Sequence, residues 1–242
     1  MTRLDAYNRE FQITLIMTQS TPSTPIVTTV RSLDLTGPAG RLEAILNSGL
    51  PDAPYVALVC HPHPKGGGTM HNKVVYHAMK ALNGLKLPVL RFNFRGTGRS
   101  EGVYDHGHGE QEDVRAVLDW LDKEFHLPIL FTGFSFGSYV GMRACCGDAR
   151  VHGLIALGLP VEAEGRGYQY SYLTACTQPK IFISGDQDEF GPVGAVTEVV
   201  ATAADPKQLV WIASANHFFV GKLDVLQSAI RDWVIQNFLP EP

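Results

Sequence analysis

Residues 129–138, Ile-Leu-Phe-Thr-Gly-Phe-Ser-Phe-Gly-Ser, decide the fold of this chain. An apolar run ends in Gly-Phe-Ser-Phe-Gly, and residues 139–145 then have the spacing of a helix. The stretch predicts a strand, a very sharp turn that carries Ser135, and a helix. Gly133 and Gly137 are expected because the two backbones approach so closely at this turn that a Cβ would collide. Ser135 should be strained, with its hydroxyl at the positive end of the helix.

The composition is that of one soluble globular domain. The 242 residues are 45% hydrophobic and 18% charged, which suffices for a large core. The formal charge of −4 and the lack of a Lys/Arg cluster predict no nucleic-acid partner. No apolar run approaches the ~18 residues of a membrane-spanning helix, so we expect no membrane partner.

The four cysteines predict a reduced protein. None forms a Cys-x-x-Cys pair, and mutual pairing of the adjacent Cys145 and Cys146 would be strained. Reduced thiols are typical of the cytoplasm, and we predict a cytoplasmic location.

The chain divides into an extension and a domain. Residues 1–25 are predicted to be an N-terminal extension or linker, because residues 19–25 are polar and interrupted by prolines. Residues 26–242 are predicted to form a single domain.

Strands and helices alternate through that domain. Two strands, 26–35 and 41–47, flank a turn at 36–40, and continuous apolar strands follow with helices between them. This pattern predicts a mostly parallel sheet of about eight strands with helices on both faces. The later strands are expected at 55–61, 88–94, 129–134, 151–157, 180–184 and 209–213, and the helices at 74–83, 111–125, 139–145, 193–203 and 224–238.

A serine nucleophile needs a base, and the base needs an acid that orients it. In folds whose nucleophilic serine lies on a sharp strand-to-helix turn, the chain order of these three residues is Ser, then Asp or Glu, then His. His217 is the candidate base, because it follows the last strand, whereas His152 lies at the wrong end of its strand.

Three acidic residues are candidates for the third position. Asp188 is preferred, because it lies three residues after Gly185 in a Gly-x-x-Asp pattern. Asp186 is the alternative, although it is better suited to orient the turn. Glu162, after the preceding strand, is a third candidate.

Two backbone N–H groups should stabilise the oxyanion. One is expected from Phe136, the residue after the serine. The other should come from the loop His-Pro-His-Pro-Lys-Gly-Gly-Gly at 61–68, where His63 lies between two prolines that have no N–H.

The three motifs His-Pro-His-Pro-x-x-Gly-Gly-Thr-Met, Asn-Phe-Arg-Gly-x-Gly-x-Ser-Glu-Gly at 93–102, and Gly-Phe-Ser-Phe-Gly together resemble a family of small bacterial α/β-hydrolases. Its members are described as lidless serine esterases of the dienelactone-hydrolase branch. The resemblance implies a catalytic triad of Ser135, Asp188 and His217, with no cofactor. It also implies the α/β-hydrolase fold with little or no lid, although residues 160–178 could form a small flap.

The predicted substrate pocket is apolar and compact. Its candidate residues are Phe134, Phe190, Phe218 and His71, and the aromatic rings among them would leave little room for a long acyl chain. No metal site is predicted, because the His61/His63 and His106/His108 pairs lack the spacing of zinc ligands.

We therefore predict a serine carboxylesterase that acts on short-chain carboxylic esters as a monomer or homodimer. The same triad could serve a serine peptidase or an acyltransferase. A hydrolase fold used only for binding is the alternative without catalysis.

Overall fold

A computed structural model describes residues 29–162 and 167–239. The predicted extension 1–25 lies outside the described residues, as do the first three residues of the predicted strand 26–35 and residues 163–166 of the predicted flap. In the part that is described, no helix is long and apolar enough to cross a lipid bilayer.

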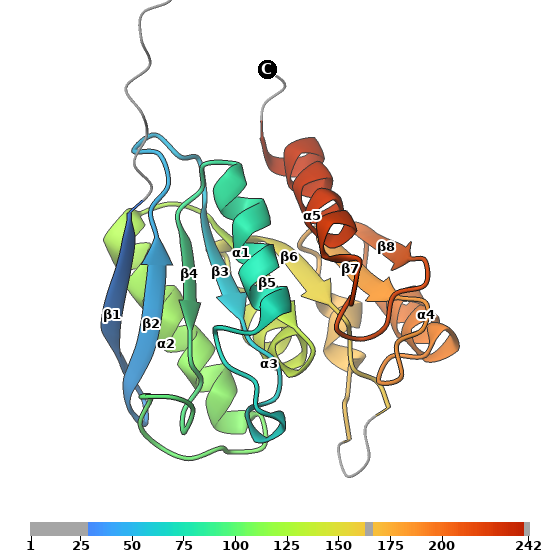
Figure 1. Cartoon of the computed structure of the whole chain (residues 1–242), viewed down its shortest axis with the longest axis horizontal. Coiled ribbons are helices and arrows are strands. Elements are labelled where there is room, and N and C mark those ends of the chain that lie inside the picture. The colour runs from blue at the N-terminus through green and yellow to red at the C-terminus, as the bar shows by residue number, and fades with distance from the viewer. Residues whose placement is uncertain (1–28, 163–166, 240–242) are drawn as a thin grey trace, which may run out of the picture.

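The architecture is an eight-stranded sheet covered on both faces by helices (Figure 1). The strand order is β1-β2-β4-β3-β5-β6-β7-β8, in which β2 is antiparallel to both of its neighbours, β1 and β4, and all other neighbouring strands are parallel. This confirms the predicted fold class. The strands are β1 (Val30–Gly37), β2 (Gly40–Asn47), β3 (Val56–Cys60), β4 (Val89–Phe92), β5 (Ile129–Phe134), β6 (Val151–Leu157), β7 (Lys180–Gly185) and β8 (Lys207–Ile212).

Two separate cores hold the helices against the sheet. The core on one face includes apolar residues of α1 and α5, and the core on the other includes those of α2, α3 and α4. Strands β3, β4 and β5 are buried along their whole length, as expected for parallel strands covered on both faces. The helices are α1 (Lys73–Gly84), α2 (His108–Phe125), α3 (Phe136–Cys145), α4 (Val193–Thr202) and α5 (Leu223–Phe238), with short 3₁₀ turns η1 (Pro64–Gly66) and η2 (Ser171–Ala175).

The sequence patterns misplaced some element ends. Helix α3 begins at Phe136 rather than at residue 139, because the sharp turn leads straight into the helix. Helix α2 begins at His108 rather than at residue 111, because the Glu110 carboxylate accepts the N–H groups of Asp105 and Gly107 and so fixes an earlier start. The turn between β1 and β2 is also tighter than the predicted 36–40, since Gly37 pairs with Gly40.

The prediction of fully reduced cysteines is wrong. Cys146, just after α3, forms a disulfide with Cys176, just after η2, and their Cα atoms lie 5.4 Å apart. The two residues are 30 positions apart in the chain, and no local pattern reveals that the fold brings them together. Cys60 and Cys145 are buried free thiols. The cytoplasmic location stays a prediction, and it loses the support of reduced thiols.

Candidate active site

Ser135 occupies the sharp turn between β5 and α3. Its φ angle is +54°, a strained value for a residue with a side chain, and its N–H donates to the carbonyl of Leu157. A Cβ on Gly133 would lie 2.5 Å from the carbonyl oxygen of Gly137, and a Cβ on Gly137 would lie 2.5 Å from that of His61. Both positions therefore exclude any larger residue, and the serine is forced to the tip of the turn.

Three strand ends bring Ser135, His217 and Asp188 together. The Nε2 atom of His217 lies 2.9 Å from the Oγ of Ser135, and its Nδ1 lies 2.9 and 2.8 Å from the two carboxylate oxygens of Asp188. All three residues are buried, with 8%, 3% and 4% of their surfaces exposed. Because the Nδ1 proton is held by the carboxylate, Nε2 is left as the acceptor that faces the serine hydroxyl.

Asp188, rather than the two other acidic candidates, contacts the imidazole. Its Oδ1 also accepts the N–H groups of Phe190 and Gly191, so the carboxylate is fixed by its own loop. Asp186 and Glu162 are both exposed. The preference for Asp188 from the Gly-x-x-Asp pattern therefore agrees with the geometry.

The two residues predicted to supply oxyanion N–H groups lie against each other. Phe136 is the first residue of α3, where a backbone N–H has no partner inside the helix. The ring centroids of His63 and Phe136 are 4.7 Å apart. The His63 side chain holds its own loop, because Nδ1 accepts the N–H of Lys65 and Nε2 lies 2.9 Å from the hydroxyl of Tyr104.

His61 is a structural residue of the same loop. It is fully buried, its Nε2 accepts the N–H of Phe94, and its Nδ1 lies 2.7 Å from the carbonyl oxygen of Pro62. Burial away from water is the main cause that lowers its pKa to about 4. The neutral ring thus fastens the end of β3 to the end of β4.

The lowered pKa of His61 predicts that this residue contributes less to the stability of the fold at acidic pH. An unfolded chain protonates His61 near its ordinary value of 6.5, whereas the folded chain resists protonation down to about pH 4. In that window the unfolded state binds more protons, so stability falls as the pH falls. Between pH 8 and pH 5 the contribution of His61 to the free energy of unfolding should drop by about 2 kcal/mol.

Urea unfolding at both pH values tests this. His61→Gln can still accept the N–H of Phe94 but does not titrate, and its loss of stability between pH 8 and pH 5 should be smaller than that of the wild type. The control, His152→Gln, replaces an exposed histidine and should keep the wild-type dependence. An unchanged dependence in His61→Gln would contradict the prediction.

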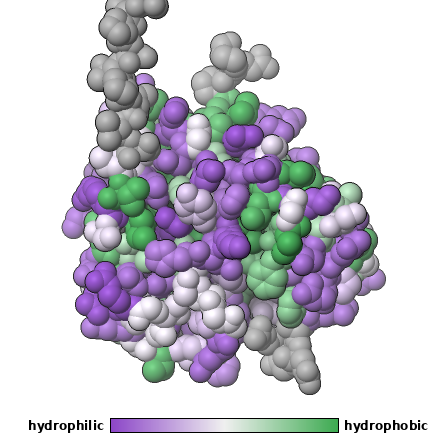
Figure 2. Space-filling view, viewed as in Figure 1, coloured by the Kyte–Doolittle hydropathy of each residue, from purple (hydrophilic) through white to green (hydrophobic). Residues whose placement is uncertain are grey.

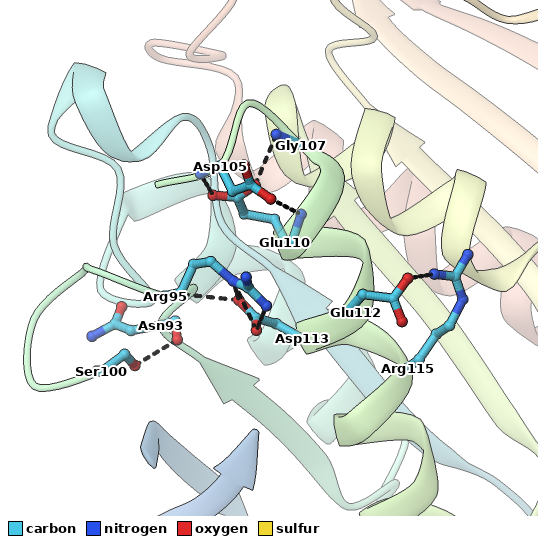
Figure 3. A network of polar contacts seen from close by, with 10 residues as sticks. Asn93, Arg95, Ser100, Asp105, Gly107, Glu110, Glu112, Asp113 and Arg115 are labelled. Carbon is cyan, nitrogen blue, oxygen red and sulfur yellow. Dashed lines mark hydrogen bonds and ion pairs between the residues drawn. The ribbon is translucent and has the colours of Figure 1, made fainter. Parts of the chain in front are cut away.

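The loop after β4 is held by a network of charged and polar groups (Figure 3). Arg95 makes a bidentate contact with the buried carboxylate of Asp113 on α2, with its closest approach at 2.7 Å. The Ser100 hydroxyl donates to the carbonyl of Asn93, and the Asn93 side chain accepts the N–H of Met70. The network therefore connects the Arg-Gly-x-Gly motif to the loop beside Ser135 and gives that motif a structural role.

A cavity of about 220 Å³ opens beside Ser135 and His217. His63, one of the two residues predicted to supply an oxyanion N–H group, lines this cavity. Two of the predicted pocket residues, Phe190 and Phe218, line it as well. The remaining wall residues are Pro62, Gly66, Gly67, Gly68, Asn72, Pro160 and Tyr168.

Two predicted pocket residues lie elsewhere. Phe134 is fully buried behind the imidazole, with its ring 5.0 Å from that of His217, and it does not line the cavity. His71 is exposed and lies outside the cavity wall. Sequence reasoning missed Asn72 and Tyr104, for which no local motif gave a signal. Tyr168, in contrast, belongs to the predicted flap segment 160–178.

Potential metal ligands do not gather near these residues. Across residues 29–162 and 167–239, no group of three His, Cys, Asp or Glu side chains could hold a metal ion. The polar groups around Ser135 can supply a nucleophile, a base and hydrogen-bond donors, which is the set that acyl transfer requires.

A mostly parallel eight-stranded sheet with serine, aspartate and histidine beyond its strand ends, in that chain order, is the arrangement of an α/β hydrolase. A family model described as an alpha/beta hydrolase domain matches residues 56–229, and the chain belongs to this family. The match confirms the resemblance to small α/β-hydrolases that the three motifs indicated, and the protein is accordingly a hydrolase of this fold.

Similar proteins come from several bacteria. A structure described as an alpha-beta serine hydrolase homologue from Coxiella burnetii is 37% identical, with a TM-score of 0.78 over 87% of this chain and 100% of that chain. A lidless α/β serine hydrolase from Xanthomonas campestris is 36% identical, with a TM-score of 0.79 over 92% and 100%. An uncharacterized protein of Rickettsia prowazekii is 36% identical over 82% of this chain and 86% of its own length.

Proposed function

We propose that this protein is a serine carboxylesterase that hydrolyses esters with short acyl groups. The hydrogen-bonded chain from the Asp188 carboxylate through His217 to the Ser135 hydroxyl is the observation that carries the proposal. A serine hydroxyl is a weak nucleophile at neutral pH, and a neutral imidazole nitrogen at 2.9 Å is the group that can accept its proton. Similarity to proteins described as serine hydrolases supports the same chemistry.

The proposed reaction has two halves. As His217 takes the serine proton, Oγ of Ser135 attacks the ester carbonyl, and the N–H groups of Phe136 and His63 stabilise the oxyanion. Asp188 stabilises the imidazolium. The imidazolium then gives its proton to the departing alcohol, and an acyl-enzyme remains. Water, activated by the same imidazole, releases the acid and restores Ser135.

The small cavity favours a short acyl group. Its volume of about 220 Å³ is bounded by aromatic and proline side chains, which occupy the space that a long chain would need. The segment after β6 contributes Pro160 and Tyr168 to this wall, and its described part contains only the short turn η2.

Hydrolysis of p-nitrophenyl esters from acetate to palmitate tests the proposal. We expect kcat/KM to peak at the short acyl chains, because longer chains exceed the cavity. A maximum at decanoate or longer would contradict the short-chain assignment. No turnover of any ester would contradict the esterase assignment. Faster consumption of ester in the presence of added alcohols, with a new ester as product, would instead indicate an acyltransferase.

A further inference from the structure

A second, apolar groove adjoins the cavity beside Ser135. It measures about 340 Å³ and shares Asn72 and Phe218 with that cavity. Its wall is otherwise formed by the start of α1 and by the segment that leads into α5, through Lys73, Val74, Val220, Gly221 and Leu223. Phe218 therefore stands between the two spaces.

Two apolar side chains in the wall of the groove are unusually exposed to solvent. Phe218 is 45% exposed and Val220 is 68% exposed, although the buried His217 lies only one and three residues before them. Figure 2 shows hydrophobic surface gathered over the loop from β8 to α5 and the adjoining start of α5. Apolar surface of this kind beside a reactive group is typical of a ligand-binding surface.

The chemistry of ester cleavage fixes the side of the site on which the alcohol portion of the substrate must lie. The departing alcohol oxygen must take its proton from Nε2 of His217, so it has to lie within hydrogen-bond reach of that atom. The alcohol portion must then leave the carbonyl carbon on the histidine side of the site. The chain that continues from His217 on this side is the segment 218–223 that walls the groove.

We infer that the groove is a leaving-group subsite, which binds the alkyl or aryl portion of the ester's alcohol across Phe218 and against Val220. The inference rests on the proposed function and sharpens its substrate class. The preferred substrates are esters of a short acid with an extended apolar alcohol or phenol.

Acetate esters of ethanol, butanol and hexanol isolate the leaving group, because all three give the same acetyl-enzyme. Each methylene that becomes fully buried can raise kcat/KM by about fourfold, the equivalent of ~0.8 kcal/mol. Since the groove is open to solvent, we expect an increase of at least tenfold from ethyl to hexyl acetate. Acid release, followed by titration at constant pH, measures all three substrates in the same way.

Val220→Asp is the variant that tests the groove. It places a charge in the groove wall, outside the proposed catalytic groups, and should lower kcat/KM for hexyl acetate by about tenfold while leaving ethyl acetate within about twofold. Val225→Asp is the matched control, because Val225 is 51% exposed on α5 but does not line the groove. It should retain the wild-type preference. Thermal unfolding of both variants shows whether they fold.

Three results would overturn the inference. Equal kcat/KM for the three acetates in the wild type would mean that the alcohol does not reach the groove. An effect of Val220→Asp on ethyl hexanoate, which has a long acid and a short alcohol, but not on hexyl acetate would assign the groove to the acyl side. In both cases the esterase proposal still holds. Failure of the wild type to hydrolyse any ester would overturn both proposals.

Discussion

Replacing Ser135 with alanine is expected to lower kcat for ester hydrolysis by at least ~10⁴-fold. The variant lacks the atom that attacks the carbonyl, and a water molecule in its place cannot form the acyl-enzyme. The residual rate enhancement of the variant should come from the oxyanion donors and from substrate positioning, which contribute less. The fold should persist, since alanine can take the same strained turn and, among the described residues, the serine side chain has only His217 as a hydrogen-bond partner.

The comparison that makes this result specific is Ser138→Ala. Ser138 is also a buried serine at the start of α3, but its hydroxyl donates to the carbonyl of Ser135 and does not contact His217. We expect less than a tenfold loss of kcat, because only the support of the turn is weakened. Steady-state kinetics of both purified variants, with circular dichroism to show folding, gives the answer. A folded Ser135→Ala enzyme with undiminished activity would rule out the proposed mechanism.

Asp188→Asn should reduce kcat by about 10³ to 10⁴-fold. The amide has the shape of the carboxylate but carries no charge, so it cannot stabilise the imidazolium that forms when His217 takes the serine proton. If its NH₂ group faces Nδ1, the imidazole must carry its proton on Nε2, which leaves no acceptor for Ser135. The backbone donors of Phe190 and Gly191 would also lose a charged acceptor.

Asp186→Asn is the paired control for this prediction. It makes the same chemical change two residues away, on an exposed side chain, and should leave kcat within about threefold of the wild type. Measuring kcat and KM for the two variants on one p-nitrophenyl ester distinguishes the candidate acids. A large loss in Asp186→Asn with little loss in Asp188→Asn would reverse the assignment.

The sequence was most informative where sterics leave few choices. Gly133 and Gly137 are dictated by backbone contacts at the sharp turn, and the order of Ser135, Asp188 and His217 follows from strands that end at one edge of a parallel sheet. For this reason the fold and the three residues that meet in the site could be predicted from local patterns.

Features that depend on long-range packing could not be predicted in this way. The Cys146–Cys176 disulfide joins segments 30 residues apart, and the contact between His63 and Tyr104 spans 41 residues. Phe134 was predicted to face the substrate, but the direction of its strand places the ring behind His217. The pattern of side chains along a strand does not show which face of the strand end remains open.

The central claim is that Ser135 is an activated nucleophile, and labelling by a fluorophosphonate tests it most directly. Such a reagent reacts with a serine whose hydroxyl is activated by a neighbouring base. After incubation and digestion, mass spectrometry should find one phosphonylated site per chain, at Ser135. Labelling should be abolished in Ser135→Ala and strongly slowed in His217→Ala. A wild-type protein that remains unlabelled, or that carries the label at another residue, would contradict the account.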